Sequence, residues 1–136
     1  MEKKYLFSPG PTMLPPEVLL KMAEPIMHHR EPEFEKLFAE IREGSRRRFI
    51  GIGTLFIDPD FGNGEFSVVV SDDYQGKGLG YKLIDTLIGI AQEKGLEKFY
   101  GIVLTDNRKM INLCRKLGFI VENWPDGLSR VELQLK

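Results

Sequence analysis

Hydrophobic residues change their spacing along this chain, and the changes divide it into short elements. The run Glu65–Ser71 carries Phe66 and three consecutive valines, which predicts a buried strand. Between Leu79 and Ala91 apolar residues recur every three or four positions, which predicts an amphipathic helix that ends near Gly95. The chain is therefore expected to pass from a strand through a glycine-rich turn into a helix.

The rest of the second half continues with short elements. Asn107 can cap a second helix that stops at Gly118, and its apolar face consists of Met110, Leu113, Cys114 and Leu117. Apolar runs predict strands around 50–57, over 99–104, from 119 and over 130–135. This alternation favours an α/β (α+β) fold.

The first 44 residues have a different pattern. Pro15 and Pro16 are suited to a helix start, and an apolar stripe follows them at Val18, Leu19, Met22 and Ala23. Pro25 should end or kink that helix. A second helix is predicted over 33–43, with Phe34, Leu37, Phe38 and Ile41 on one face. The front of the chain is thus expected to be helical.

Composition narrows the classes of protein further. The chain has 136 residues, enough for one ordinary domain, and its 19 basic and 20 acidic residues nearly cancel. We therefore expect no nucleic-acid partner and interpret Arg46, Arg47 and Arg48 as a solvated cluster. One cysteine and two histidines without ligand spacing indicate no disulfide and no metal site. No long apolar segment or signal peptide is recognised, so a cytoplasmic protein without a membrane partner is expected.

The turn between the first strand and its helix has the features of a phosphate cradle. Its residues Gln75 to Gly80 read Gln-Gly-Lys-Gly-Leu-Gly, and glycines allow a phosphate to approach the free N–H groups of a helix start. Tyr81 stands where a dinucleotide-binding turn needs a third glycine, and a P-loop needs Gly-Lys-Ser/Thr, which is absent here. A glycine-rich turn without a ligand is the alternative.

The pattern Gln-x-x-Gly-x-Gly resembles the acetyl-CoA pyrophosphate loop of the GNAT acetyltransferases. Asn107-x-x-Met110 followed by Leu117-Gly118-Phe119 resembles the second signature of that family. Within the family, residues 46–136 most resemble domains of the protein-lysine acetyltransferase and acyl-CoA-synthetase-linked kind. The resemblance implies a GNAT-like mixed sheet and a cofactor, acetyl-CoA or CoA. It implies these cofactor-binding residues: Val69 and Val70 through their backbones, then Gln75, Gly76, Lys77, Gly78, Leu79, Gly80 and Asn107.

Two residues are candidates for catalysis. Glu65 stands where relatives of this kind often place a glutamate base, although it could equally be an exposed carboxylate beside a turn. Many GNAT enzymes carry a tyrosine acid at the position that Cys114 occupies here. Cys114 falls on the apolar face of its helix, so core packing is its alternative role. Asn107 can likewise be a helix cap, and Lys77 a lysine that only faces solvent.

Residues 5–44 resemble a second family, the class V aminotransferases that depend on pyridoxal phosphate. The resemblance rests on Pro9-Gly10-Pro11-Thr12, His28-His29-Arg30 and Pro32-Glu33-Phe34, and it covers the N-terminal arm of that family. The large cofactor domain is absent, and no lysine can be assigned to the Schiff base. No pyridoxal phosphate and no aminotransferase activity are therefore expected, and His28 and His29 are interpreted as turn residues.

The two resemblances together predict a chimera with a seam near Gly44-Ser45. Residues 1–44 would be a helical arm without a domain of its own, and 45–136 a truncated GNAT domain. In the family a strand, two helices and a second strand form the front half, which shapes the acceptor site; the helical segment would replace it. The arm would cover bare sheet surface or join two chains, which predicts a homodimer through residues 1–44.

The predicted function is acetyl-CoA-dependent N-acetylation of a primary amine, on a small molecule or a protein lysine. The alternative is a non-catalytic chimera that binds CoA or self-associates.

Overall fold

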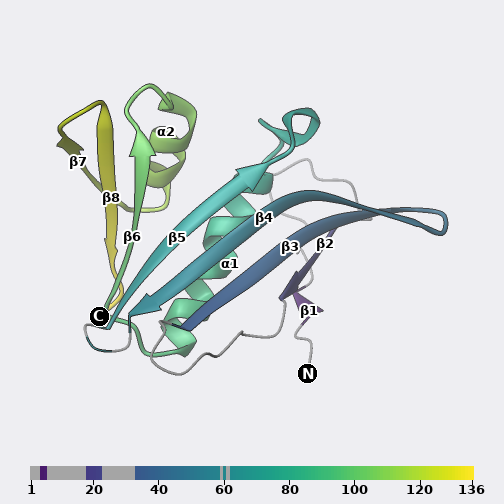
Figure 1. The fold of residues 1–136 in the computed structure, drawn as a ribbon, viewed down its shortest axis with the longest axis horizontal. Helices are drawn as coiled ribbons and strands as arrows, with labels where there is room; N and C mark the ends of the chain where they lie inside the picture. Colours follow the sequence, from purple (N-terminus) through teal and green to yellow (C-terminus); the bar gives the residue numbers. More distant parts are fainter. Residues whose placement is uncertain (1–3, 6–17, 23–32, 59, 61) are drawn as a thin grey trace.

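The computed structural model describes residues 4–5, 18–22, 33–58, 60 and 62–136, which form one mixed sheet with two α-helices (Figure 1). The sheet order is β1-β2-β3-β4-β5-β6-β8-β7. The strands are β1 (Lys4–Tyr5), β2 (Val18–Met22), β3 (Glu33–Glu43), β4 (Arg46–Asp58), β5 (Asn63–Val70), β6 (Lys98–Leu104), β7 (Ile120–Trp124) and β8 (Leu128–Gln134). The helices are α1 (Leu79–Glu93) and α2 (Arg108–Lys116), and one 3-10 turn, η1 (Asp72–Tyr74), follows β5. Neighbouring strands are antiparallel except β5 and β6, which are parallel.

Helix α1 packs across one face of the sheet. Its buried residues are Leu79, Leu83, Ile84, Leu87, Ile88, Ile90 and Ala91, which confirms the predicted apolar face. Two glycines of β4 let the helix come close to the sheet. A Cβ at Gly51 would lie 3.2 Å from Leu83 Cδ1, and one at Gly53 would lie 3.0 Å from Leu87 Cδ1. This close packing fixes where the N-terminus of α1 stands relative to the strands.

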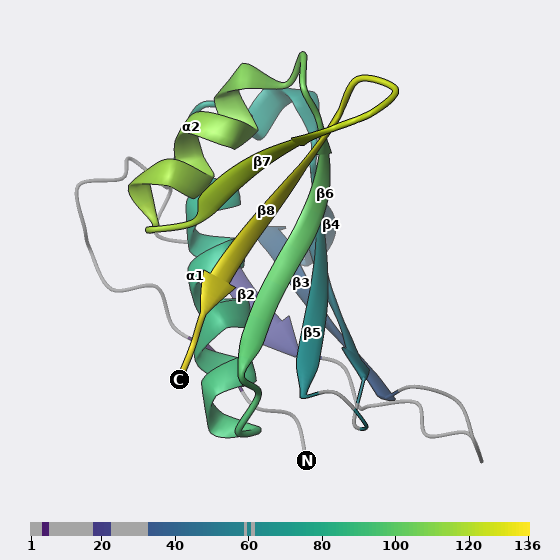
Figure 2. The ribbon, with the colours of Figure 1, turned by 90° about the vertical axis from the view of Figure 1, so that its left-hand side faces the viewer.

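Helix α2 lies on the same side of the sheet as α1 (Figure 2). Beneath it three aromatic rings join β5, β6 and the segment after α2. Phe66 stacks on Phe99 with ring centroids 4.9 Å apart, and the Phe119 ring lies 5.6 Å from that of Phe66. The strands and helices predicted for residues 50–135 are confirmed, with ends that differ by a few residues.

The opposite side of the sheet, which we call the open face, carries no helix within the described residues. Strand register places on it all the large hydrophobic side chains that the described structure leaves exposed: Phe49, Phe56, Val69, Ile102, Leu104, Ile120 and Trp124. Two aromatic pairs lie there as well, Phe34 with Phe56 at 6.0 Å and Phe38 with Phe49 at 5.4 Å between ring centroids. Among the described residues, one face of the sheet is thus covered by helices, and the other is uncovered and carries exposed apolar side chains.

The helix predicted over residues 33–43 is wrong, because this segment is β3 and pairs along its whole length with β4. The spacing of its apolar residues fits a helix, but it also fits a strand with two apolar faces. As a strand it buries Leu37 and Ile41 on the side of α1, while Phe34 and Phe38 lie on the open face. Pairing satisfies the backbone groups along the edge of β4, and such a tertiary gain outweighs small differences in helix propensity.

The helix predicted from Pro15 is also wrong where the structure describes it, since Val18–Met22 form β2 and pair with β3. The front of the chain thus contributes strands to the GNAT-like sheet, and the helical replacement segment is not found among residues 4–5, 18–22 and 33–43. The predicted seam at Gly44-Ser45 falls in the turn of the β3–β4 hairpin, so strands on both sides of it share one sheet. Pro25, His28 and His29 lie outside the described residues.

Candidate functional site

The N-terminus of α1 carries backbone N–H groups that no described side chain caps. Gly78 precedes the helix with φ 87°, a left-handed conformation that glycine adopts without strain. The first helical hydrogen bond runs from Lys82 N to Gly78 O at 3.1 Å, so the N–H groups of residues 79–81 have no partner within the helix. The first turn contains no acidic residue. The helix dipole and these N–H groups together favour a bound anion.

The turn before α1 is held by the side chain of Gln75. Its Nε2 donates to Val70 O at 3.1 Å and to Asp72 Oδ1 at 3.2 Å, which ties the end of β5 to η1. Gly76 follows with φ 74°, and a Cβ placed there would meet nothing within 4 Å. Gln75 therefore shapes the turn from inside, while the space beside Gly76 stays open.

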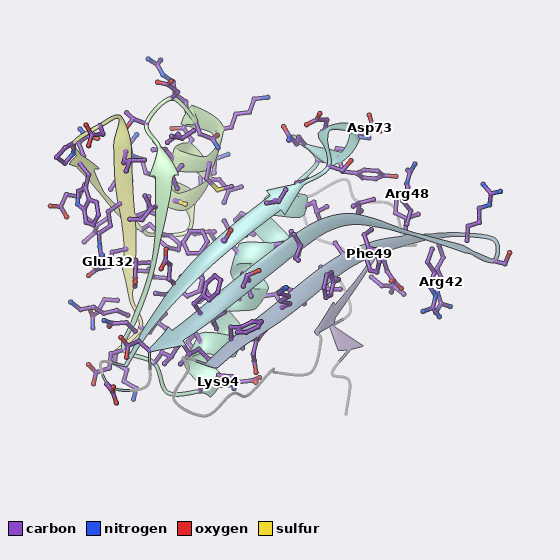
Figure 3. All side chains as sticks on the ribbon, viewed as in Figure 1. Arg42, Arg48, Phe49, Asp73, Lys94 and Glu132 are labelled. Carbon is purple, nitrogen blue, oxygen red and sulfur yellow. The ribbon has the colours of Figure 1, made fainter. Side chains whose placement is uncertain are left out.

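Positive side chains flank the same turn. Lys77 Nζ lies 5.1 Å from the centroid of the Tyr74 ring, and Arg48 Nη2 donates to the Tyr74 hydroxyl at 3.3 Å. Figure 3 shows Arg48 on the β3–β4 hairpin beside the turn that carries Asp73. Lys77 is exposed and one residue before the helix cap, so its charge adds to the positive potential at the start of α1.

A gap opens between β5 and β6. The two strands pair only from Asn63 to Glu65 on β5 and from Lys98 to Tyr100 on β6, and beyond these residues they diverge (Figure 1). The next residue on β5, Phe66, lays its ring against Gly101, where a Cβ would lie only 2.6 Å from Phe66 Cε1. The missing side chain of Gly101 therefore makes room for the ring where the gap begins.

The backbone of β5 offers hydrogen-bonding groups to this gap. Ser71 N donates to Ile50 O at 2.8 Å, and antiparallel pairing alternates from there, so the groups of Val69 also point toward β4. The groups of Val68 and Val70 point the other way, toward β6. Val70 and Val68 are thus better placed than Val69 to bind a ligand in the gap, although Gln75 already occupies the carbonyl of Val70.

Glu65 stands at the closed end of the gap, on the open face. Its side chain is half-buried, and the Tyr100 hydroxyl donates to its Oε2 at 3.4 Å. Burial raises the pKa of Tyr100, and the charge of Glu65 raises it further, so the phenol stays protonated and keeps its donor. In the described part of the chain no cation pairs with Glu65. Its carboxylate therefore has one described hydrogen-bond donor and no described cation at the end of the gap.

The other two candidate residues lie on the α2 side. Asn107 is the N-cap of α2, and its Oδ1 accepts from Met110 N at 3.2 Å, which leaves its amide NH₂ for another partner. Cys114 is fully buried, and desolvation raises its pKa to about 11. Its thiol packs in the core and does not reach the gap surface, which fits its packing role.

Three residues of this region were not predicted from sequence. Tyr100 and Gly101 lie inside an apolar run that indicated only a buried strand, and Arg130 lies in the last strand. Arg130 lies 4.1 Å from the Tyr100 ring centroid, across the β6–β8 pair. Residue alternation along β6 could have shown which face Tyr100 lies on. Its neighbours Glu65 and Arg130 could be found only with the registers of β5, β6 and β8 known.

The described residues contain no group of three or more side chains that could hold a metal ion. Nor does any helix among them have the length and apolar character needed to cross a membrane.

The sequence model of the Acetyltransferase (GNAT) family matches residues 8–119. An acetyltransferase of Pseudomonas aeruginosa is 34% identical over 93 residues, which are 68% of this chain and 50% of the relative. An uncharacterized aminotransferase of Methanocaldococcus jannaschii is 30% identical over 129 residues, which are 95% of this chain and 31% of the relative. The structure of yncA from Salmonella typhimurium, solved with its cofactor acetyl-CoA, matches with TM-score 0.63 and 27% identity, over 76% of this chain and 65% of that chain.

The chain spans half or less of the length of these two curated relatives. Residues 46–136 make up about two thirds of the chain, so a structural match over 76% of it must include residues before 46. The likeness in fold therefore extends into the strands at the front, in agreement with the observed β3.

Proposed function

The chain belongs to the Acetyltransferase (GNAT) family, and we propose that it transfers the acetyl group of acetyl-CoA to the nitrogen of a primary amine. One observation carries the proposal: the uncapped N-terminus of α1 lies where β5 and β6 have diverged. An anion can bind there while an attached chain runs along the gap toward Glu65. The uncapped helix end would supply the anion site, and the diverging strands would supply unpaired backbone groups beside the attached chain.

The residues present fit CoA. Space beside Gly76 is open, and at Gly80 the nearest atom to an added Cβ is Leu113 Cδ1 at 3.7 Å, so a pyrophosphate can approach the backbone of Gln75 to Gly80. Lys77 would add charge. Val68 and Val70 would offer backbone groups to the pantetheine arm from one side of the gap, and the Asn107 amide would do so from the other.

When bound, acetyl-CoA supplies an activated thioester. Glu65 would take the proton of the incoming amine, directly or through a water, so that nitrogen can attack the carbonyl carbon. A backbone N–H in the gap would donate to the carbonyl oxygen as its charge grows. As the electron pair on oxygen returns to carbon, the C–S bond would break and its electron pair would leave on sulfur. A thiol has an ordinary pKa of about 8.5, so the thiolate can leave without an acid. Cys114, buried in the core, takes no part.

Substitution of Gly80 tests the anion site. Gly80→Asp would place a carboxylate in the first turn of α1, which helps the helix itself but repels a pyrophosphate. We expect the Kd for CoA to rise more than tenfold, about 1.4 kcal/mol, in calorimetric titration. Gly78 is less suitable, because its φ of 87° would strain any other residue.

Two variants serve as controls for this test. Gly80→Ala adds size without charge, and Gly89→Asp adds the same charge at an open position of α1 away from its N-terminus. Both should bind CoA nearly as well as the parent chain. Equal affinity in Gly80→Asp and the parent chain would remove the anion site from the proposal. Thiol release from acetyl-CoA with a panel of amines, in the parent chain and in Glu65→Gln, then tests turnover and the base.

A second candidate function is a chain that binds CoA or self-associates without turnover. The observation that favours it is the apolar open face, which no described helix covers. CoA binding that Gly80→Asp weakens, without thiol release for any amine, would select this alternative.

The origin of the front segment and its role in assembly are also proposals. An aminotransferase-like origin for residues 5–44 rests on the sequence resemblance, since the Methanocaldococcus jannaschii relative matches 95% of this chain, on both sides of residue 44, and the GNAT family model itself begins at residue 8. A homodimer through residues 1–44 is supported by Phe34 and Phe38, which β3 presents on the open face. A protein lysine and a small amine both remain candidate acceptors under this proposal.

A further inference from the structure

A row of side chains crosses the open face at the closed end of the gap. Strand register aligns Phe34, Phe56, Glu65, Tyr100 and Glu132, which come from β3, β4, β5, β6 and β8 in turn. The two phenylalanine rings lie 6.0 Å apart, and the Tyr100 hydroxyl reaches Glu65. We call these five residues the aromatic–carboxylate row. Its middle member is the proposed base, with an aromatic ring on each side.

The two carboxylates of the row differ in their partners. Glu132 Oε2 accepts from Arg130 Nη2 at 2.8 Å and from Arg130 Nε at 3.2 Å, and Lys98 Nζ lies 3.6 Å from Glu132 Oε1. The hydrogen bond from Arg130 holds the pKa of Glu132 below its usual value. Figure 3 shows Glu132 on the β8 side of the sheet. Glu65, in contrast, has no cationic partner in the residues that the structure describes, so its negative charge is available to a ligand.

A third carboxylate lies beside the row. Asp58 follows Phe56 by two residues on β4 and pairs with Asn63, so strand alternation puts it on the same face as Glu65. Its Oδ1 accepts from Asp60 N at 3.1 Å. Burial and the charge of Glu65 raise the pKa of Tyr100, and the charge of Asp58 raises it further, so both carboxylates act on the same hydroxyl.

The cations near the row are already engaged. Arg130 donates twice to Glu132 and lies 4.1 Å from the centroid of Tyr100 and 5.7 Å from that of Trp124. Lys36 Nζ lies 5.7 Å from the ring centroid of Phe34, at the far end of the row. Lys98, which lies in the same cross-strand line as Asp58 and Asn63, is held by Glu132 at 3.6 Å. Among the described residues, a carboxylate on the acceptor would therefore meet Asp58 and Glu65 beside cations that already have other partners, whereas an ammonium would meet two carboxylates and an aromatic ring.

We propose that the aromatic–carboxylate row and Asp58 form the acceptor subsite, and that it selects an alkyl diamine or a comparable cationic chain over a free α-amino acid. This inference rests on the proposed acetyl transfer. The reacting nitrogen lies at Glu65 between Phe56 and Tyr100, where the rings favour a cation. A second ammonium lies at Asp58, since diagonal neighbours on paired strands are about 7 Å apart. Tyr100 is a positioning residue that orients Glu65 through its hydroxyl.

The test compares 1,5-diaminopentane with L-lysine, which differ only by a carboxylate. The expected kcat/KM is at least about tenfold higher for the diamine, and Asp58→Asn, which keeps the acceptor for Asp60 N, should bring the ratio close to one. Phe56→Leu should lower kcat/KM for the diamine by about fivefold to tenfold, mainly through KM. Phe49→Leu is the matched control, because Phe49 is exposed on the same face but outside the row.

Equal kcat/KM for the two amines, or an unchanged ratio in Asp58→Asn, would overturn the subsite. Calorimetric titration of both amines in the presence of CoA gives a readout without turnover. If the diamine binds more tightly than L-lysine and Asp58→Asn abolishes the difference, the subsite is supported even where no acetyl transfer occurs. Selective binding without acetyl transfer would overturn the proposed reaction and not the subsite. Equal binding of the two amines would overturn the subsite whatever the reaction proves to be.

Discussion

Gly101→Ala tests the packing that accompanies the gap between β5 and β6. A Cβ at Gly101 would lie 2.6 Å from Phe66 Cε1 and 2.7 Å from Phe66 Cζ, well inside contact distance. The ring has little freedom to retreat, because it is stacked on Phe99 with an angle of 7° between the planes and meets the Phe119 ring edge-on. The new methyl must therefore displace the aromatic cluster or push β6 away from β5.

Overpacking of a filled core typically costs about 1–3 kcal/mol, and the loss of glycine from a strand returns about 0.5–1 kcal/mol. We expect a net loss of about 1–2 kcal/mol, which lowers Tm by roughly 4–8 °C for a chain of this size. Gly89→Ala is the matched control. Nothing lies within 4 Å of a Cβ at Gly89 in the middle of α1, so the same change should raise stability by up to about 1 kcal/mol.

Thermal and urea unfolding would measure both variants, each also in a Phe66→Leu background. If the clash is with the Phe66 ring, the loss due to Gly101→Ala should shrink clearly when the ring is replaced by leucine. An undiminished Tm for Gly101→Ala would refute the reasoning, as would a loss of the same size in both backgrounds.

Two further outcomes are expected. Arg130 lowers the pKa of Glu132 in the folded chain, so this carboxylate adds stability above its ordinary pKa of 4.5, and the gain is lost as pH falls through the lower folded pKa. Urea unfolding below pH 4.5 should therefore show a shallower decline in stability for Glu132→Gln than for the parent chain. Light scattering after size exclusion should give twice the 15.6 kDa mass of the chain. Deletion of residues 1–44 removes β3 and should give aggregates, because it exposes the edge of β4. A stable monomeric 45–136 fragment would contradict a structural role for the front segment.

The local structure of the proposed phosphate end of the site could be predicted from sequence, because neighbouring residues build it. Strand, glycine turn and helix are contiguous, and the free N–H groups at the start of α1 follow from the helix geometry alone. Gly78 has the left-handed conformation for which glycine is suited, and Asn107 caps α2 as its sequence position indicates. Such features depend on residues only a few positions apart, so they can be recognised in a single sequence.

The front of the sheet could not be predicted in the same way. Leu37, Phe38 and Ile41 fit both a helical spacing and a strand with two apolar faces, and the choice between them depends on whether β4 has an edge to pair with. That edge is a property of the assembled sheet. The helical spacing and the resemblance to a helical arm of another family both favoured a helix. Pairing with β4 instead stabilises a strand, because it outweighs the small difference in local helix propensity.

The acceptor end of the site depends on register between strands that are far apart in the chain. Glu65 meets Tyr100 across 35 positions of sequence, and Phe56 lies beside them only because β4 pairs with β5 in one particular register. A shift of that register by one residue would move Phe56 or Glu65 to the other face. The candidate base could therefore be named from sequence, but the residues proposed to select its substrate could not.

The two roles proposed for the open face compete. Its exposed phenylalanines and leucine favour contact with another surface, while the aromatic–carboxylate row on the same face needs access for an acceptor. Contact through Phe38 and Phe49, near the tip of the β3–β4 hairpin, would leave Glu65 accessible, because the row crosses β3 and β4 at Phe34 and Phe56 near the other end of these strands. Contact centred on Phe56 would cover the row. The division of apolar residues along β3 and β4 thus decides whether self-association and acetyl transfer can coexist in one assembly.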